Sequence, residues 1–105
     1  MPNHRVAVIQ AGSSLFDTPK TLDRMQAQCE AARAEGAELA VFPEAYIGGY
    51  PKGLDFGARV GSRTPEGREW FRRYWESAVD VPGPATEDLG SAAREAGAHL
   101  VIGVI

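Results

Sequence analysis

The sequence has little of what several classes of protein require. It has one cysteine, so no disulfide can form within the chain, and its two histidines stand apart, with no Cys/His cluster at metal-ligand spacing. Its first apolar stretch, residues 6–9, is too short for a signal peptide core or a bilayer span. The net charge of −3 gives no electrostatic reason to expect nucleic acid or an anionic membrane as partner. We therefore expect a protein of the reducing cytoplasm.

The residues that are present fit a small globular unit of the α/β class. Of the 105 residues, 44% are hydrophobic and 24% are charged, which argues against disorder. Short apolar runs at residues 5–10, 39–42 and 99–105 predict three buried strands. The first two runs are separated by a helical pattern of about 18 residues, an order that is typical of a parallel βαβ unit.

Capping residues mark where the helices begin and end. Thr18 followed by Pro19 predicts a helix start, because Thr can cap a helix and Pro fits its first position. Gly36 is expected to end that helix, since glycine readily adopts the left-handed conformation found there. Residues 64–65 repeat the Thr-Pro start before a second helix, and Gly97 is expected to end a third.

Two groups of residues on these helices allow more than one interpretation. The apolar stripe of the first helix, formed by Leu22, Met25, Cys29 and Ala32, favours a packed core thiol over a nucleophilic one, because burial opposes the thiolate. The second helix carries four aromatic side chains on one side, which fits either core packing or a contact between subunits. These are Trp70, Phe71, Tyr74 and Trp75.

The position of Glu44 in the chain suggests a catalytic role. It directly follows the apolar run 39–42, and ligands of open α/β sheets bind beyond the carboxyl ends of the strands. We expect Phe42, Tyr46 and Tyr50 to shield its carboxylate in part, so that it could serve as a general base. A loop glutamate after a strand is also commonly a solvated residue, and this alternative stays open on the residues alone.

The segment around Glu44 resembles a known family. Residues 37–53, AELAVFPEAYIGGYPKG, are similar to the segment around the catalytic glutamate of the nitrilase branch of the carbon–nitrogen hydrolases. Residues 5–11 resemble that family's first strand, and residues 57–61, 66–68 and 81–84 follow in family order. The GGYPKG continuation is closer to nitrilases that act on organic nitriles than to their cyanide-degrading relatives.

The resemblance implies a fold and a reaction. The family has an αββα sandwich fold that forms dimers, and members use a glutamate, a lysine and a cysteine to hydrolyse a small nitrile through a covalent thioimidate and thioester. It requires no metal or organic cofactor. Glu44 matches the glutamate, whereas neither Lys52 nor Cys29 matches the motif of the lysine or the nucleophile. We expect those two residues to lie beyond Ile105.

Residues 1–105 are accordingly expected to form the N-terminal segment of a single carbon–nitrogen hydrolase domain, truncated at its C-terminus and inactive alone. The expected enzyme is a nitrilase and a homo-oligomer, with neither nucleic acid nor membrane as a partner. Two alternatives remain. One is an amidase-like relative, and the other is a non-catalytic βαβ binding or assembly module that is complete at 105 residues.

Overall fold

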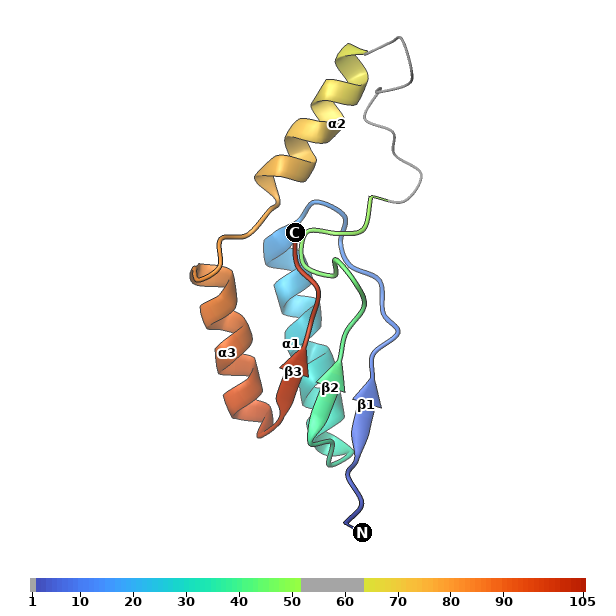
Figure 1. The fold of residues 1–105 in the computed structure, drawn as a ribbon, viewed down its shortest axis with the longest axis vertical. Helices are drawn as coiled ribbons and strands as arrows, with labels where there is room; N and C mark the ends of the chain where they lie inside the picture. The colour runs from blue at the N-terminus through green and yellow to red at the C-terminus, as the bar shows by residue number, and fades with distance from the viewer. Residues whose placement is uncertain (1, 52–63) are drawn as a thin grey trace.

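The computed structural model describes residues 2–51 and 64–105, and within them the chain forms a three-stranded parallel sheet with helices (Figure 1). The elements in chain order are β1 (Val6–Val8), α1 (Thr18–Ala34), β2 (Leu39–Val41), α2 (Pro65–Glu76), α3 (Pro84–Ala96) and β3 (His99–Val101). The strands follow the order β1-β2-β3, all parallel, which confirms the predicted α/β class and the βαβ unit. Each strand is shorter than the apolar run that predicted it.

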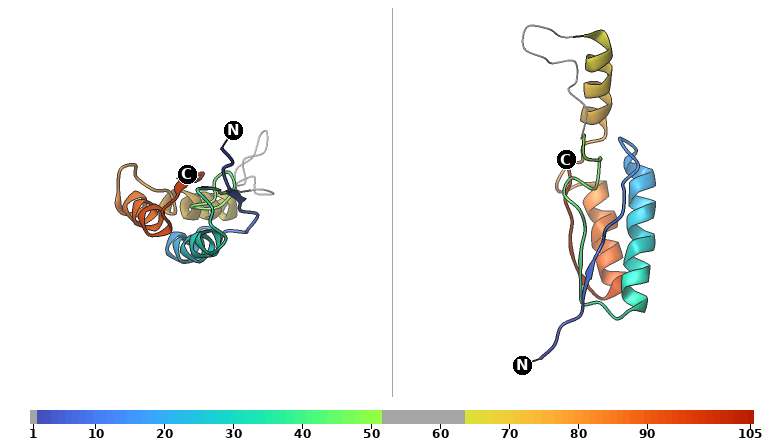
Figure 2. Two further views of the ribbon diagram at one scale, coloured as in Figure 1. Left: turned by 90° about the horizontal axis from the view of Figure 1, so that it is seen from below. Right: turned by 90° about the vertical axis from the view of Figure 1, so that its right-hand side faces the viewer.

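The two faces of the sheet differ because side chains alternate along a strand. Ala7, Ala40 and Leu100 are partners in the parallel register and pack against the core that α1 and α3 cover. Figure 2 shows both helices on this same side of the strands. On the other face Val8 is 71% exposed and Val101 is 56% exposed. The prediction that these strands are buried is therefore wrong for one face, because the described residues supply only one layer of helices.

Helix α1 begins one residue earlier than the capping pattern predicted. Asp17 is its N-cap, and the Asp17 carboxylate accepts a hydrogen bond from the backbone N–H of Lys20 at 3.1 Å. The Thr18 hydroxyl instead donates to the backbone carbonyl of Ser77, which ties the start of α1 to the end of α2. The left-handed Gly36 follows the helix, as expected. The buried stripe is Thr21, Met25, Cys29 and Ala32.

Helix α2 projects beyond the carboxyl ends of the strands, apart from α1 and α3 (Figure 1). Its predicted cap is confirmed, because the Thr64 hydroxyl accepts from the Gly67 backbone N–H at 3.0 Å. Of its residues only Gly67 is buried, while Trp75 is 72% exposed. The core interpretation of the aromatic side is therefore wrong for Trp75, and a contact between subunits stays a prediction.

Candidate functional site

The segment after β2 leaves the sheet and then returns to it. The Phe42 backbone N–H donates to the Val101 carbonyl at 2.8 Å, as a parallel ladder requires. In an uninterrupted ladder the next hydrogen bond would run from the Glu44 N–H to the Gly103 carbonyl. Here the Ile47 N–H donates to that carbonyl instead, at 3.0 Å. Three residues, 44–46, are therefore extruded as a bulge. Bulges of this kind redirect side chains and are frequent next to active sites.

Several interactions hold the bulge in one conformation. Ala45 has a φ of +49°, an uncommon value for a residue other than glycine, and its carbonyl accepts from the Gly49 N–H at 3.1 Å. The Tyr46 ring is buried against Phe42, with the ring centroids 5.3 Å apart. Ile47 is fully buried where the chain rejoins the sheet. The bulge thus sends Tyr46 inward and leaves Glu44 outside.

The surroundings of Glu44 differ from the expected shielding. Glu44 is exposed, because the bulge turns Tyr46 into the core, where it packs on Phe42. Tyr50 is itself 55% exposed. The expectation that these three rings cover the carboxylate is therefore wrong for the described chain. Lys52 and residues 57–61, which contributed to the resemblance, lie outside the described residues.

A hollow adjoins the bulge at the carboxyl ends of β1 and β2. Residues 8–11 and 41–43 line it, so it ends directly before Glu44. A position beyond the carboxyl ends of neighbouring parallel strands is where ligands of open α/β sheets bind. The structure therefore brings the loop after β1 and the bulge after β2 to the same edge of the sheet.

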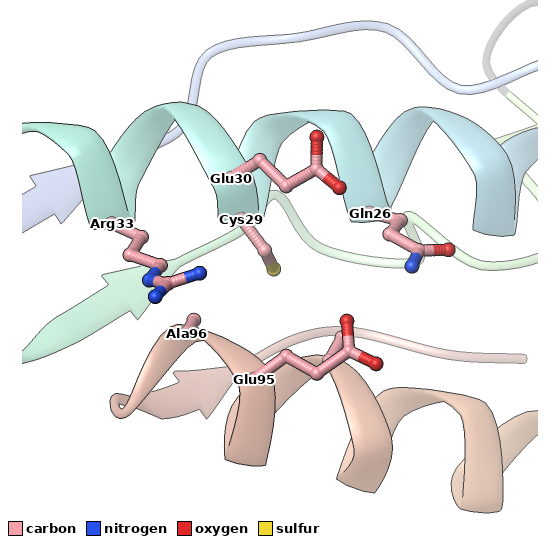
Figure 3. A pocket seen from close by; sticks show the side chains of 7 residues that line it. Gln26, Cys29, Glu30, Arg33, Glu95 and Ala96 are labelled. Atoms are coloured by element: carbon pink, nitrogen blue, oxygen red, sulfur yellow. The ribbon is translucent and has the colours of Figure 1, made fainter.

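Cys29 is a core residue on the helix side of the sheet. It is 2% exposed, and its Sγ donates to the Met25 Sδ at 3.6 Å. Figure 3 shows its thiol in a groove between α1 and α3, with Glu30 and Glu95 at the sides. Burial raises the pKa of the Cys29 thiol. The prediction of a packed core thiol is confirmed.

A second buried polar group lies in the bulge itself. The hydroxyl of Tyr46 has no hydrogen-bond partner among the described residues, and burial raises its pKa. Within those same residues no three His, Cys, Asp or Glu side chains are grouped closely enough to hold a metal ion. Residues 2–51 and 64–105 also include no helix both long and apolar enough to cross a membrane.

Comparisons with known proteins agree with the resemblance around Glu44. A family model described as carbon-nitrogen hydrolase matches residues 5–105. The aliphatic nitrilase of Sinorhizobium fredii is 50% identical over 105 residues, which are all of this chain and 34% of that protein. The bifunctional nitrilase/nitrile hydratase NIT4B of Nicotiana tabacum is 48% identical over 99% of this chain and 30% of its own length. The chain thus spans about a third of the length of these relatives.

The burial of Cys29 predicts a thiol that reacts slowly with alkylating reagents. Because the thiolate is the reactive form and burial raises the pKa, labelling by iodoacetamide should be slow at pH 7 and accelerate as the pH rises. Mass spectrometry after timed labelling measures this, and labelling in urea gives the rate for the exposed thiol. Rapid labelling of the folded chain at pH 7 would contradict the core assignment.

Proposed function

This chain belongs to the carbon–nitrogen hydrolase family, and we propose that it supplies the general base of an enzyme that hydrolyses an organic nitrile to a carboxylic acid and ammonia. The proposed base is Glu44. The observation that carries this assignment is the bulge of residues 44–46, which sets one carboxylate outside the sheet at the carboxyl end of β2. The open hollow lined by residues 8–11 and 41–43 lies at the same edge of the sheet.

We propose further that residues 1–105 are the N-terminal segment of one hydrolase domain. The chain matches about a third of the length of its relatives, and one face of its sheet exposes Val6, Val8 and Val101. Parallel sheets are normally covered on both faces. In the proposed αββα sandwich, the remainder of the domain covers this face. That same layer would complete the surroundings of Glu44, which this chain leaves open.

The proposed reaction explains why a carboxylate is needed. A nitrile carbon is a weak electrophile, so a cysteine thiolate attacks it and forms a covalent thioimidate. One water then adds, ammonia leaves, and a second water hydrolyses the thioester to the acid and restores the thiol. Glu44 accepts the thiol proton, delivers protons to the nitrogen and activates both waters. A lysine stabilises the charge that develops on the tetrahedral centre.

The nucleophile and the lysine come from outside this chain in this proposal. Cys29 is buried in the helix layer rather than placed at the carboxyl ends of the strands, so it does not serve as the nucleophile. The chemistry runs through side chains and water, without a metal or an organic cofactor. The free thiol of Cys29 fits a reducing compartment, so we propose a cytoplasmic enzyme.

The family match by itself admits amide substrates as well as nitriles. The names of the similar proteins, aliphatic nitrilase among them, favour nitriles. Parallel assays of a nitrile and the corresponding amide on the complete protein distinguish the two. A non-catalytic βαβ module is disfavoured by the bare apolar face, since such a face needs a cover.

Replacing Glu44 tests the assignment. Glu44→Gln in the complete protein should lower nitrile turnover by roughly 10²- to 10⁴-fold, because proton transfer by a positioned base is worth about that factor. Ammonia release measures turnover, and thermal unfolding checks the fold. Glu30→Gln, an exposed acid-to-amide change on α1, is the matched control and should leave turnover unchanged. Turnover near the unsubstituted level in Glu44→Gln would refute the role.

The segment alone should be inactive. Purified residues 1–105 are expected to release no ammonia from a nitrile, because the proposed nucleophile and lysine are supplied by the rest of the domain. The same assay with Cys29→Ala serves as the control for the one thiol in the chain. Ammonia release that is abolished by Cys29→Ala would overturn the proposal.

We also propose that the enzyme is a homo-oligomer and that the aromatic side of α2 contributes to a contact between subunits. Trp75 is exposed and Trp70 is half-buried on a helix that projects from the body, and large aromatic residues are enriched in interface centres.

Trp75→Ala and Trp70→Ala should therefore reduce the size of the assembly, since truncating an aromatic anchor costs about 2 kcal/mol or more. Gel filtration with light scattering measures the size. Tyr50→Ala, which removes another exposed aromatic ring, is the matched control and should leave the size unchanged. An assembly of unchanged size in both tryptophan variants would exclude this surface.

A further inference from the structure

We propose that Gly103 is a positioning residue for Glu44, an inference that rests on the proposed function of Glu44. Gly103 follows β3, and its backbone lies directly against the bulge. A Cβ atom at position 103 would lie 2.3 Å from the backbone nitrogen of Ala45 and 2.9 Å from both the Cα and the carbonyl carbon of Glu44. Since real contacts of a Cβ atom are essentially never below 3.0 Å, any side chain at position 103 must shift the bulge or the backbone that carries Gly103, and the Ile47 N–H bond joins these two segments.

The displacement would reach the carboxylate because of which atoms are involved. The Cα of Glu44 is the atom from which its side chain departs, so a shift of this atom moves the carboxylate with it. The bulge also has few ways to adjust its backbone while leaving Glu44 in place. Ile47 is held to Gly103 and Ile105 by hydrogen bonds of 3.0 and 3.2 Å, and Ala45 already has the uncommon φ of +49°. The position of Glu44 therefore depends on residue 103 being a glycine, without a side chain.

The two other glycines near the bulge have softer neighbours. A Cβ at Gly48 would come closest to Cγ1 and Cδ1 of Ile105, and one at Gly49 to Cδ1 of Leu15, so both glycines are required chiefly by their positive φ values of +101° and +103°. Such atoms can move by rotation about a side-chain bond. At Gly103 the opposing atoms are backbone atoms of residues 44 and 45, which cannot move without changing the bulge.

A double-mutant cycle in the complete protein tests this role. Gly103→Ala should lower kcat by about 10- to 100-fold with KM nearly unchanged, because a displacement of about 1 Å at a catalytic group can cost a factor of 10². In the Glu44→Gln background the same change should lower the residual kcat by no more than about twofold, since the carboxylate through which it acts is already gone. Gly90→Ala is the matched control, because a Cβ there meets no atom closer than 3.5 Å.

The outcomes separate positioning from a merely structural role. Equal losses of kcat in the two backgrounds, or an unchanged kcat in Gly103→Ala alone, would overturn the inference. A Glu44→Gln protein with full turnover would instead refute the proposed function, whatever Gly103→Ala does.

A second variant covers the case in which Gly103→Ala does not fold. Ala45→Val strains the backbone that Gly103 supports, since a β-branched residue is a genuine outlier at the φ of +49° found there. It should lower kcat about 10-fold when Glu44 is present and by no more than about twofold in the Glu44→Gln background, for the reasons that apply to Gly103→Ala. An unchanged kcat, or equal losses in the two backgrounds, would contradict the inference.

Discussion

One backbone hydrogen bond organises the candidate site, the bond from the Ile47 N–H to the Gly103 carbonyl. By taking the place that Glu44 would hold in a regular ladder, Ile47 forces the three residues before it out of the sheet. The bulge does not cost the sheet its continuity, because the Ile105 N–H then donates to the Ile47 carbonyl and the parallel pairing resumes. A charged side chain is thereby placed outside the sheet while the strand beneath it stays paired.

The division of the bulge between core and solvent follows from the same bond. Tyr46 and Ile47 are buried, and the Tyr46 ring packs at a tilt of 50° against Phe42, so the apolar side chains on either side of Glu44 anchor the segment in the core. A carboxylate in the same position as these rings would carry a large desolvation cost. Exposure of the Glu44 carboxylate on the outer side of the bulge avoids this desolvation penalty. A covering layer would change the surroundings of the carboxylate without moving the backbone that holds it.

Among the described residues, helices cover only one face of the sheet. Ala40 and its register partners face α1 and α3, whereas Val8 and Val101 face outward without cover from the described residues. Helix α2 does not provide that cover, because it continues beyond the ends of the strands (Figure 1). The bare face and the open position of Glu44 therefore have one explanation in the proposed function, namely that another layer of the same domain packs here.

The sequence by itself determined the α/β class, the parallel βαβ order, the Thr64 cap and the core position of Cys29, and it singled out Glu44 as the candidate general base. These features depend on local chemistry, such as capping side chains, apolar periodicity and a charged residue directly after an apolar run. Only the tertiary structure decided that residues 44–46 bulge, that Tyr46 turns inward and that Gly103 supports them. The sequence shows Gly103 as a lone glycine in the apolar run 99–105. The reason for this glycine is its contact with a backbone almost 60 positions away. Such contacts are formed by pairing between strands, which no local pattern specifies.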